Sequence, residues 1–215
     1  IQFAVAEETP YVYNAQLMNA VKMHSGNVYL KGYYQSHKYF EYFLPQILSL
    51  LKLSVQKNII KRLFESQLAD KPVSMHFRVG DYVNHPGCHP ILGQDYYMNA
   101  LEHITSSTPV THIMMFYEQS DKEYLEPTIN ALKTRFPKLV FITPDRVIPD
   151  WSEMLLMSCC SHNIIANSTF SWWGAYLNEK PDAIVCYPSL WFGSAIKAND
   201  LSDLFPERWI KIQAT

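Results

Sequence analysis

The residues whose types and spacing best suit chemistry are a histidine and an arginine at the end of an apolar strand pattern. Across residues 72–82 (PVSMHFRVGDY), apolar residues alternate with smaller or polar ones, and the pattern breaks at Gly80, directly after His76 and Arg78. The carboxyl ends of strands in open α/β sheets form the ligand crevice, and a guanidinium can bind two phosphate oxygens at once. Arg78 is therefore a candidate anion ligand. The alternative is that it only pairs with Asp81 across the turn.

A second pattern typical of anion binding lies in residues 162–177 (HNIIANSTFSWWGAYL). Its isoleucines predict a short buried strand, Asn167-Ser168-Thr169 predicts a polar turn, and a helix is expected from Ser171. Such a turn presents free N–H groups and the positive end of the helix dipole to an anion. The alternative is an ordinary helix cap, which Ser and Thr also favour. The turn matches a glycosylation sequon as well, but the buried strand before it and the packed helix after it argue against glycosylation.

Strand and helix patterns alternate after residue 72, and these elements must position the two candidate segments. We expect strands at 73–78, 111–117, 139–143, 163–166 and 183–187, and helices at 94–104, 121–136, 152–161 and 171–177. Asp121 is the expected N-cap of the second of these helices. The alternation predicts βαβ units and a parallel sheet. The expected fold class is therefore α/β, with a doubly wound, Rossmann-like nucleotide-binding domain.

The first 71 residues are less regular. They predict a helix at 11–23, a strand at 28–30, a helix from Ser36 toward Pro45, and another that begins at Ser54. Asp70-Lys71-Pro72 breaks the last of these helices. We therefore predict two domains, with boundaries at 1–71 and 72–215.

Composition excludes several classes of function. The chain has 215 residues, of which 48% are apolar and 18% charged, as in soluble globular proteins. The net charge of −2 argues against a general nucleic-acid surface, so any anion site must be local. No apolar run is long enough to span a bilayer, and residues 1–10 lack the basic start of a signal peptide. The four cysteines show neither metal spacing nor a disulfide framework, which suits a reducing compartment.

Taken together, the two candidate segments resemble the α-1,2-fucosyltransferases of glycosyltransferase family 11. The family pattern H-x-R-R-G-D-Y is met from His76 to Tyr82, except that Val79 replaces the second arginine. The pattern N-S-T-F-S-W-W-G-A is met without a mismatch at residues 167–175. With smaller likenesses on either side, the resemblance extends from about Tyr29 to Phe192.

Two departures from the family pattern matter. The glycine-rich G-G-L-G-N-Q segment of the family has no counterpart here, which predicts an incomplete N-terminal domain. The family's F-S-D-D is also absent, and residues 116–121 (FYEQSD) stand in its place. The second departure puts local contacts in doubt but not the class of enzyme.

The resemblance implies a GT-B-type glycosyltransferase that transfers L-fucose from GDP-fucose to a galactoside hydroxyl, with inversion and in α-1,2 linkage. The expected partners are GDP-fucose and a galactose-containing glycan acceptor. The negative charge that develops on the departing phosphate must be neutralised. Because the sequence has no Asp-x-Asp to hold a metal, we expect no metal or other cofactor, and assign this role to Arg78 and the turn at residues 168–170. The location stays open: cytoplasmic if the protein is bacterial-like or viral, the Golgi membrane if it is animal-like.

The resemblance also implies roles for further residues. We expect donor binding by Asn167, Ser168, Thr169, Phe170 and Ser171. His76 is expected to contact a phosphate or the ribose, unless it only packs. Asp81 is either an orienting partner of Arg78 or a general base, and orientation is favoured because a carboxylate beside arginine is a poor base near neutrality. Glu153, with Asp150 behind it, is a candidate to read guanine; the alternative is a solvated acid at a helix start.

Three alternatives remain. The chain could be another inverting fucosyltransferase, of the α-1,6 or protein O-fucosyl type, although the Ser-Trp-Trp-Gly run favours the α-1,2 family. It could also be a non-catalytic GDP-sugar-binding fragment of such an enzyme. Finally, residues 85–89 (HPGCH) bring three possible metal ligands together. Because a structural zinc site needs a second ligand pair, we interpret this segment as a loop over the mouth of the site.

Overall fold

The computed structural model describes residues 4–8, 11–196 and 200–214. The chain forms two compact units, one made of residues 1–52 with 197–207 and the other of residues 53–196 with 208–215. The units therefore separate at Leu53, earlier than the predicted boundary at Pro72. Helix α3 (Leu53–Leu63) belongs to the second unit because it packs on helix α7 (Asp150–Cys159).

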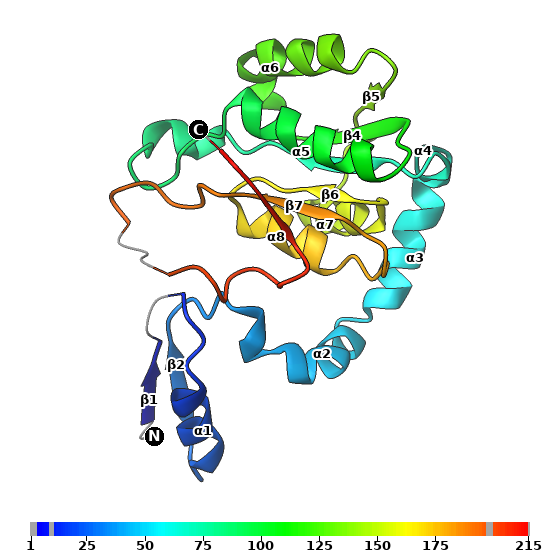
Figure 1. The fold of residues 1–215 in the computed structure, drawn as a ribbon. Coiled ribbons are helices and arrows are strands. Elements are labelled where there is room, and N and C mark those ends of the chain that lie inside the picture. The colour runs from blue at the N-terminus through cyan, green and yellow to red at the C-terminus, as the bar shows by residue number, and fades with distance from the viewer. Residues whose placement is uncertain (1–3, 9–10, 197–199, 215) are drawn as a thin grey trace. The chain divides into compact units, whose positions relative to one another are not determined.

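The first unit contains a two-stranded parallel sheet and one longer helix (Figure 1). Strand β1 (Ala4–Glu7) pairs with β2 (Val28–Lys31), and α1 (Ala15–Met23) connects them. The predicted helix at 11–23 begins later, because the Asn14 side chain accepts the Leu17 N–H at 2.9 Å and caps it there.

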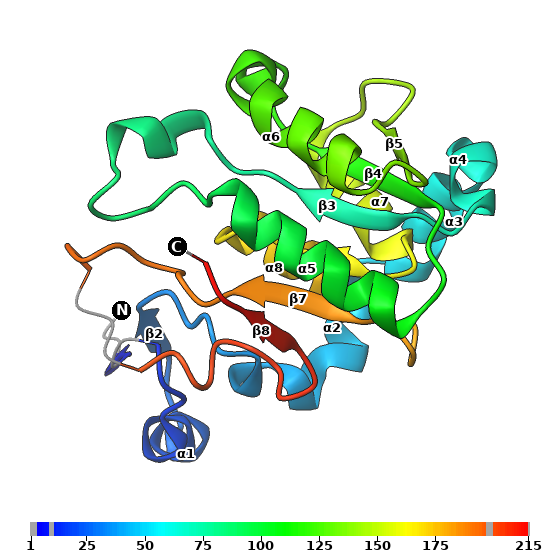
Figure 2. The same ribbon diagram turned by 45° about the horizontal axis from the view of Figure 1, so that its top comes forward.

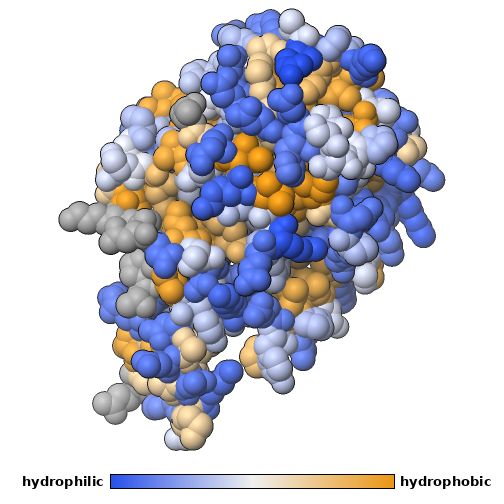
Figure 3. Space-filling view, viewed as in Figure 1, coloured by the Kyte–Doolittle hydropathy of each residue, from blue (hydrophilic) through white to orange (hydrophobic). Residues whose placement is uncertain are grey.

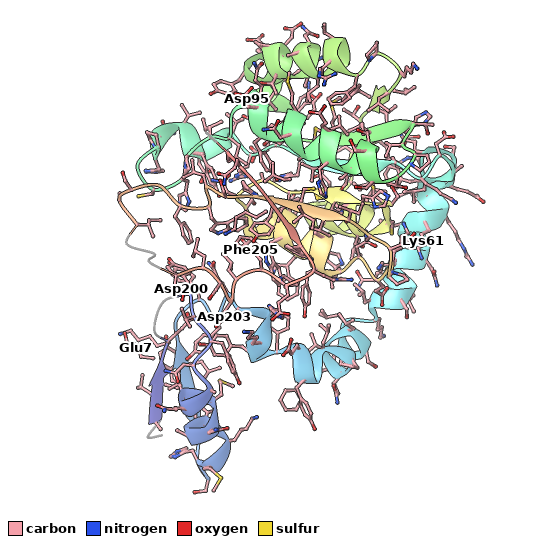
Figure 4. The ribbon with its side chains drawn as sticks, viewed as in Figure 1. Glu7, Lys61, Asp95, Asp200, Asp203 and Phe205 are labelled. Carbon is pink, nitrogen blue, oxygen red and sulfur yellow. The ribbon has the colours of Figure 1, made fainter. Side chains whose placement is uncertain are left out.

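The helix predicted from Ser36 is wrong as a single element. Two short 3-10 helices (His37–Tyr39 and Glu41–Phe43) precede α2 (Leu44–Leu50). Ser36 does cap the first of them, but the backbone leaves the helical region at Phe40 (φ −130°). In the same unit, the Asp203 carboxylate accepts the Tyr13 N–H and pairs with Lys38, and so ties residues 200–207 to the N-terminal elements (Figure 4).

The second unit is built on a six-stranded sheet in which all pairs are parallel, with strand order β5-β4-β3-β6-β7-β8. Its strands are β3 (Val73–His76), β4 (His112–Phe116), β5 (Val140–Ile142), β6 (Asn163–Ile164), β7 (Val185–Pro188) and β8 (Ile210–Ile212). Its helices after α3 are α4 (Glu65–Ala69), α5 (Gln94–Ser107), α6 (Lys122–Arg135), α7 and α8 (Thr169–Tyr176). The predicted α/β class with a parallel sheet is confirmed, and of the strands in this sheet only β8 was not expected.

Helices cover both faces of this sheet. Figures 1 and 2 show α5 and α6 on one face and α7 and α8 on the other. The core between α5 and the sheet is fully buried, with Val73 and Met75 of β3 packed beside Tyr96, Leu101 and Ile104. Burial on both faces explains why the strands read as apolar runs.

Helices α7 and α8 approach each other closely. A Cβ added to Gly174 would lie 3.0 Å from Met157 Cβ, so only glycine fits this contact without a shift.

Among the described residues, no helix is long and apolar enough to cross a membrane. On the face seen in Figure 3, hydrophilic and hydrophobic side chains are interspersed.

Candidate active site

The site lies where the winding of the sheet reverses. From β3 the chain moves outward to β4, whereas from β6 it moves outward to β7, and β3 and β6 are neighbours. In open α/β sheets the crevice outside such a switch point collects ligands. A cavity of about 690 Å³ opens there, lined by His76, Arg78, Asp81, Tyr82, Tyr117, Glu118, Asp150, Glu153, Ser168, Thr169 and Phe170.

Arg78 is held by two carboxylates at this cavity. Its Nη1 lies 2.6 Å from Glu118 Oε1, and its Nη2 lies 2.6 Å from Asp81 Oδ1. The guanidinium carbon also lies 5.3 Å from the centre of the Tyr82 ring. Arg78 therefore pairs with Asp81 and also lines the cavity. Its pairing with Asp81 does not exclude a role in anion binding.

His76 is buried next to Arg78 and stays neutral. Burial, and to a smaller extent the charge of Arg78, lowers the pKa of His76 to about 3. Its ring lies 5.7 Å from that of Phe170, and its Nδ1 has no hydrogen-bond partner among the residues that the structure describes. A neutral imidazole in this position can donate one hydrogen bond or accept one, so it suits a polar ligand in the cavity.

The start of α8 faces the same cavity. Ser168 is the N-cap residue and makes no side-chain cap bond, so helix geometry leaves the first backbone N–H groups, at residues 169–171, without an acceptor inside the helix. Ser168, Thr169 and Phe170 line the cavity. Free N–H groups and the helix dipole favour an anion here.

Two of the residues predicted to bind the donor do not line the cavity. Asn167 is 2% exposed, and its amide donates to the carbonyls of Pro90 and Trp191 at 2.8 and 3.3 Å. Ser171 is 1% exposed, and its hydroxyl donates within the turn to the Ser168 carbonyl at 3.2 Å. Both side chains hold the shape of the turn.

Tyr82 connects the two candidate segments. Its hydroxyl donates to the Asn167 carbonyl at 2.9 Å, while its ring lies beside Arg78. The His89 ring stacks on the Tyr82 ring, with 4.8 Å between the ring centres. The HPGCH loop is fixed in turn to residues 193–195, whose N–H groups donate to the Cys88 and Gly87 carbonyls. Within the described part of the chain, no group of three or more metal-ligating side chains comes together.

Acidic residues form one wall of the cavity. Burial, followed by the nearby charges of Asp150 and Glu118, raises the pKa of Glu153. These three acids also line a second cavity of about 710 Å³, beyond the ends of β4 and β5, together with Tyr117, Lys122, Thr143 and residues 144–148. The two cavities therefore share one wall.

Two cavity residues were missed from the sequence. Tyr117 and Glu118 follow directly after β4, the neighbour of β3, and so lie at the same edge of the sheet as Arg78. The rule that identified Arg78, polar residues at the carboxyl end of a strand, applies to Glu118 as well.

Comparisons with known proteins agree with the motifs. The sequence profile of glycosyl transferase family 11 matches residues 7–213. The O-antigen biosynthesis glycosyltransferase WbnK of Escherichia coli is 35% identical over 142 residues, which are 65% of this chain and 44% of that protein. The alpha-1,2-colitosyltransferase of Escherichia coli is 28% identical over 196 residues, 87% of this chain and 63% of that protein. The chain thus spans between 44% and 63% of the length of these relatives.

Solved structures of other glycosyltransferases show a distant likeness. ADP-heptose LPS heptosyltransferase II of Escherichia coli aligns with a TM-score of 0.47 and 13% identity, over 73% of this chain and 42% of that chain. A family 9 glycosyl transferase from Veillonella parvula DSM 2008 aligns with a TM-score of 0.44 and 10% identity, over 74% and 40%.

Proposed function

The chain belongs to glycosyltransferase family 11, and from this premise we propose that it transfers L-fucose from GDP-fucose to a galactoside hydroxyl, with inversion and in α-1,2 linkage. The observation that carries the proposal is the meeting of two anion-binding features, Arg78 and the start of α8, at one cavity. In this proposal the diphosphate of the donor lies between them.

Departure of the diphosphate is the step that these residues assist. Breaking the bond between fucose and the β-phosphate leaves negative charge on that phosphate, which Arg78 and the α8 N–H groups stabilise. Neutral His76 offers one further hydrogen bond to the same group. No step needs a metal, because the positive charge comes from the chain itself.

The geometry also favours an orienting role for Asp81 over a catalytic base. Inversion requires the acceptor oxygen to attack from the side opposite the departing phosphate. Asp81 and Glu118 both contact Arg78, the proposed ligand of that phosphate, and so lie on the leaving-group side. We therefore propose that the base lies across the sugar ring from Arg78.

The second cavity accommodates the nucleoside in this proposal. It adjoins the proposed diphosphate site at Tyr117, which lines both cavities and offers an aromatic face. Glu153 lies on the shared wall, where its carboxylate can accept from the N1–H and the amino group of guanine. Because Glu153 is partly buried, leaving its carboxylate without a hydrogen-bond partner is costly. Its hydrogen bonds would therefore favour guanine over nucleobases that lack these donors.

Colitose is a second candidate for the transferred sugar, since one relative is named an alpha-1,2-colitosyltransferase. Colitose is fucose without the hydroxyl on carbon 3. A site that hydrogen-bonds this hydroxyl would reject colitose by about 10⁴-fold, whereas a merely apolar pocket would discriminate far less.

The experiment is a donor comparison with the purified chain. Calorimetry with GDP, ADP and UDP should show selective binding of GDP, and transfer assays on a β-galactoside should then compare GDP-fucose with GDP-colitose. Equal binding of all three nucleotides would refute the guanine assignment. Selective GDP binding without transfer from either donor would instead support the non-catalytic alternative.

A further inference from the structure

The loop after β4, which departs from the family pattern, is tied to the Arg78 turn at two points. The Glu118 carboxylate pairs with Arg78 at 2.6 Å, and the Asp121 carboxylate accepts the Gly80 N–H at 3.0 Å. Asp121 was expected to cap α6, but it makes no side-chain cap bond there, so its carboxylate serves this contact. Gly80 has a positive φ (+36°), and a Cβ there would lie 3.3 Å from Glu118 Oε1.

Arg78 therefore has both terminal nitrogens occupied before any donor arrives. A diphosphate that makes the two-pronged contact with the guanidinium therefore competes with these carboxylates for its N–H groups. Asp81 belongs to the same turn as Arg78, three residues away, and Gly80 beside it is held by Asp121. Glu118 comes from the loop after another strand and has the longer side chain, so it is the partner that can leave, although both carboxylates are exposed (54% for Glu118 and 65% for Asp81).

Charge around the cavity points the same way. Among the described residues, four carboxylates line it, those of Asp81, Glu118, Asp150 and Glu153, and Arg78 is the one lysine or arginine in its lining. A diphosphate beside Glu118 would meet direct repulsion if this side chain stayed in place. The second cavity, which Glu118 also lines, contains Arg146, which is already paired with Asp145 at 2.9 Å, and Lys122, so Lys122 is the cation toward which the displaced carboxylate can turn.

We infer that Glu118 is a built-in competitor of the donor: its carboxylate occupies the position on Arg78 that a phosphate takes, and donor binding exchanges one anion for the other. This inference rests on the proposed role of Arg78 in diphosphate binding. Its consequence is that the arginine stays ordered and neutralised while the site is empty, at the cost of weaker donor binding.

Inorganic pyrophosphate is the probe, because it tests the exchange without the nucleoside. Glu118→Gln keeps the size of the side chain but removes the competing charge, and should tighten pyrophosphate and GDP binding about 3- to 10-fold by calorimetry. The matched control is Glu102→Gln. Glu102 pairs with Arg135 at 2.8 Å with a similar exposure, 54%, on another part of the unit, so this variant should leave both affinities unchanged.

The sign of the change separates the exchange from a purely structural role. If Glu118 only supported Arg78, Glu118→Gln would weaken pyrophosphate binding. Weaker or unchanged pyrophosphate binding in this variant would overturn the inference. In an Arg78→Ala background the gain should shrink, because the two residues act on one contact. A protein that binds pyrophosphate more tightly on Glu118→Gln but shows no preference for GDP would refute the proposed donor and keep the exchange.

Discussion

Removing the Arg78 side chain tests the proposed function most directly. The structure allows an estimate of its effect on GDP binding. Two charge-assisted hydrogen bonds to a diphosphate contribute about 1.5–3 kcal/mol each. Forming them breaks the ion pair with Glu118, which is partly exposed and worth about 0.2–1 kcal/mol. The net contribution is then about 2–6 kcal/mol.

At about 1.4 kcal/mol per tenfold change, Arg78→Ala should weaken GDP binding roughly 30- to 20,000-fold. Turnover should fall by at least about 10²-fold, because the same contacts strengthen as charge develops on the phosphate. Arg78→Lys should recover only part of both, since lysine keeps the charge but not the two-pronged geometry.

Isothermal calorimetry measures the affinity, and single-turnover transfer measures the chemical step. Arg135→Ala is the matched control, because it removes an arginine from an exposed ion pair with Glu102, and it should bind GDP as the wild type does. Wild-type affinity and turnover in Arg78→Ala would refute the assignment, as would an equal loss in Arg135→Ala.

Three further predictions follow from the same structure. Chelator treatment should leave transfer intact, and activity that is lost with EDTA and restored by Mn²⁺ would contradict charge neutralisation by Arg78. Because burial lowers the pKa of His76 from 6.5 to about 3, the unfolded state binds more protons between these values. The free energy of unfolding should therefore rise with pH in this window, and His76→Asn should flatten that slope in denaturant titrations at pH 4 to 7. Asn163→Ala should destabilise the protein by about 2–4 kcal/mol, because the buried Asn163 amide donates to Ser74 Oγ and the Met157 carbonyl and its oxygen accepts from Asn178. A change below about 0.5 kcal/mol in urea unfolding would contradict this network.

The sequence predicted most of the second unit because its signals are local. Apolar strands alternate with helices, and parallel order follows from that alternation, so Arg78 and residues 168–170 could be placed at strand ends before the structure was known. Long-range packing was not visible. Neither the contact of α3 with α7, which moves the unit boundary to Leu53, nor strand β8 leaves a periodic pattern in the sequence.

Side-chain direction at the site was harder to predict than position. Asn167 lies in a turn that suits a ligand, but its amide is engaged by Pro90 and Trp191, which are 77 and 24 residues away in the chain. Asp121 stands at the start of α6 as expected, yet its carboxylate reaches Gly80 on another loop. In both cases the side chain bonds to a residue that is remote in the sequence, so its direction could not be predicted from the local pattern.

The two anion-binding features depend on each other through Tyr82. Its hydroxyl donates to the Asn167 carbonyl directly before α8, and its ring lies beside the guanidinium of Arg78. Electrostatic stabilisation of a departing phosphate is effective only when the donors are already in place and need no rearrangement during the reaction. Tyr82 belongs to the turn after β3, and its hydrogen bond to Asn167 couples this turn to the turn after β6. We therefore expect Tyr82 to hold Arg78 near the start of α8 during the proposed exchange of its partners.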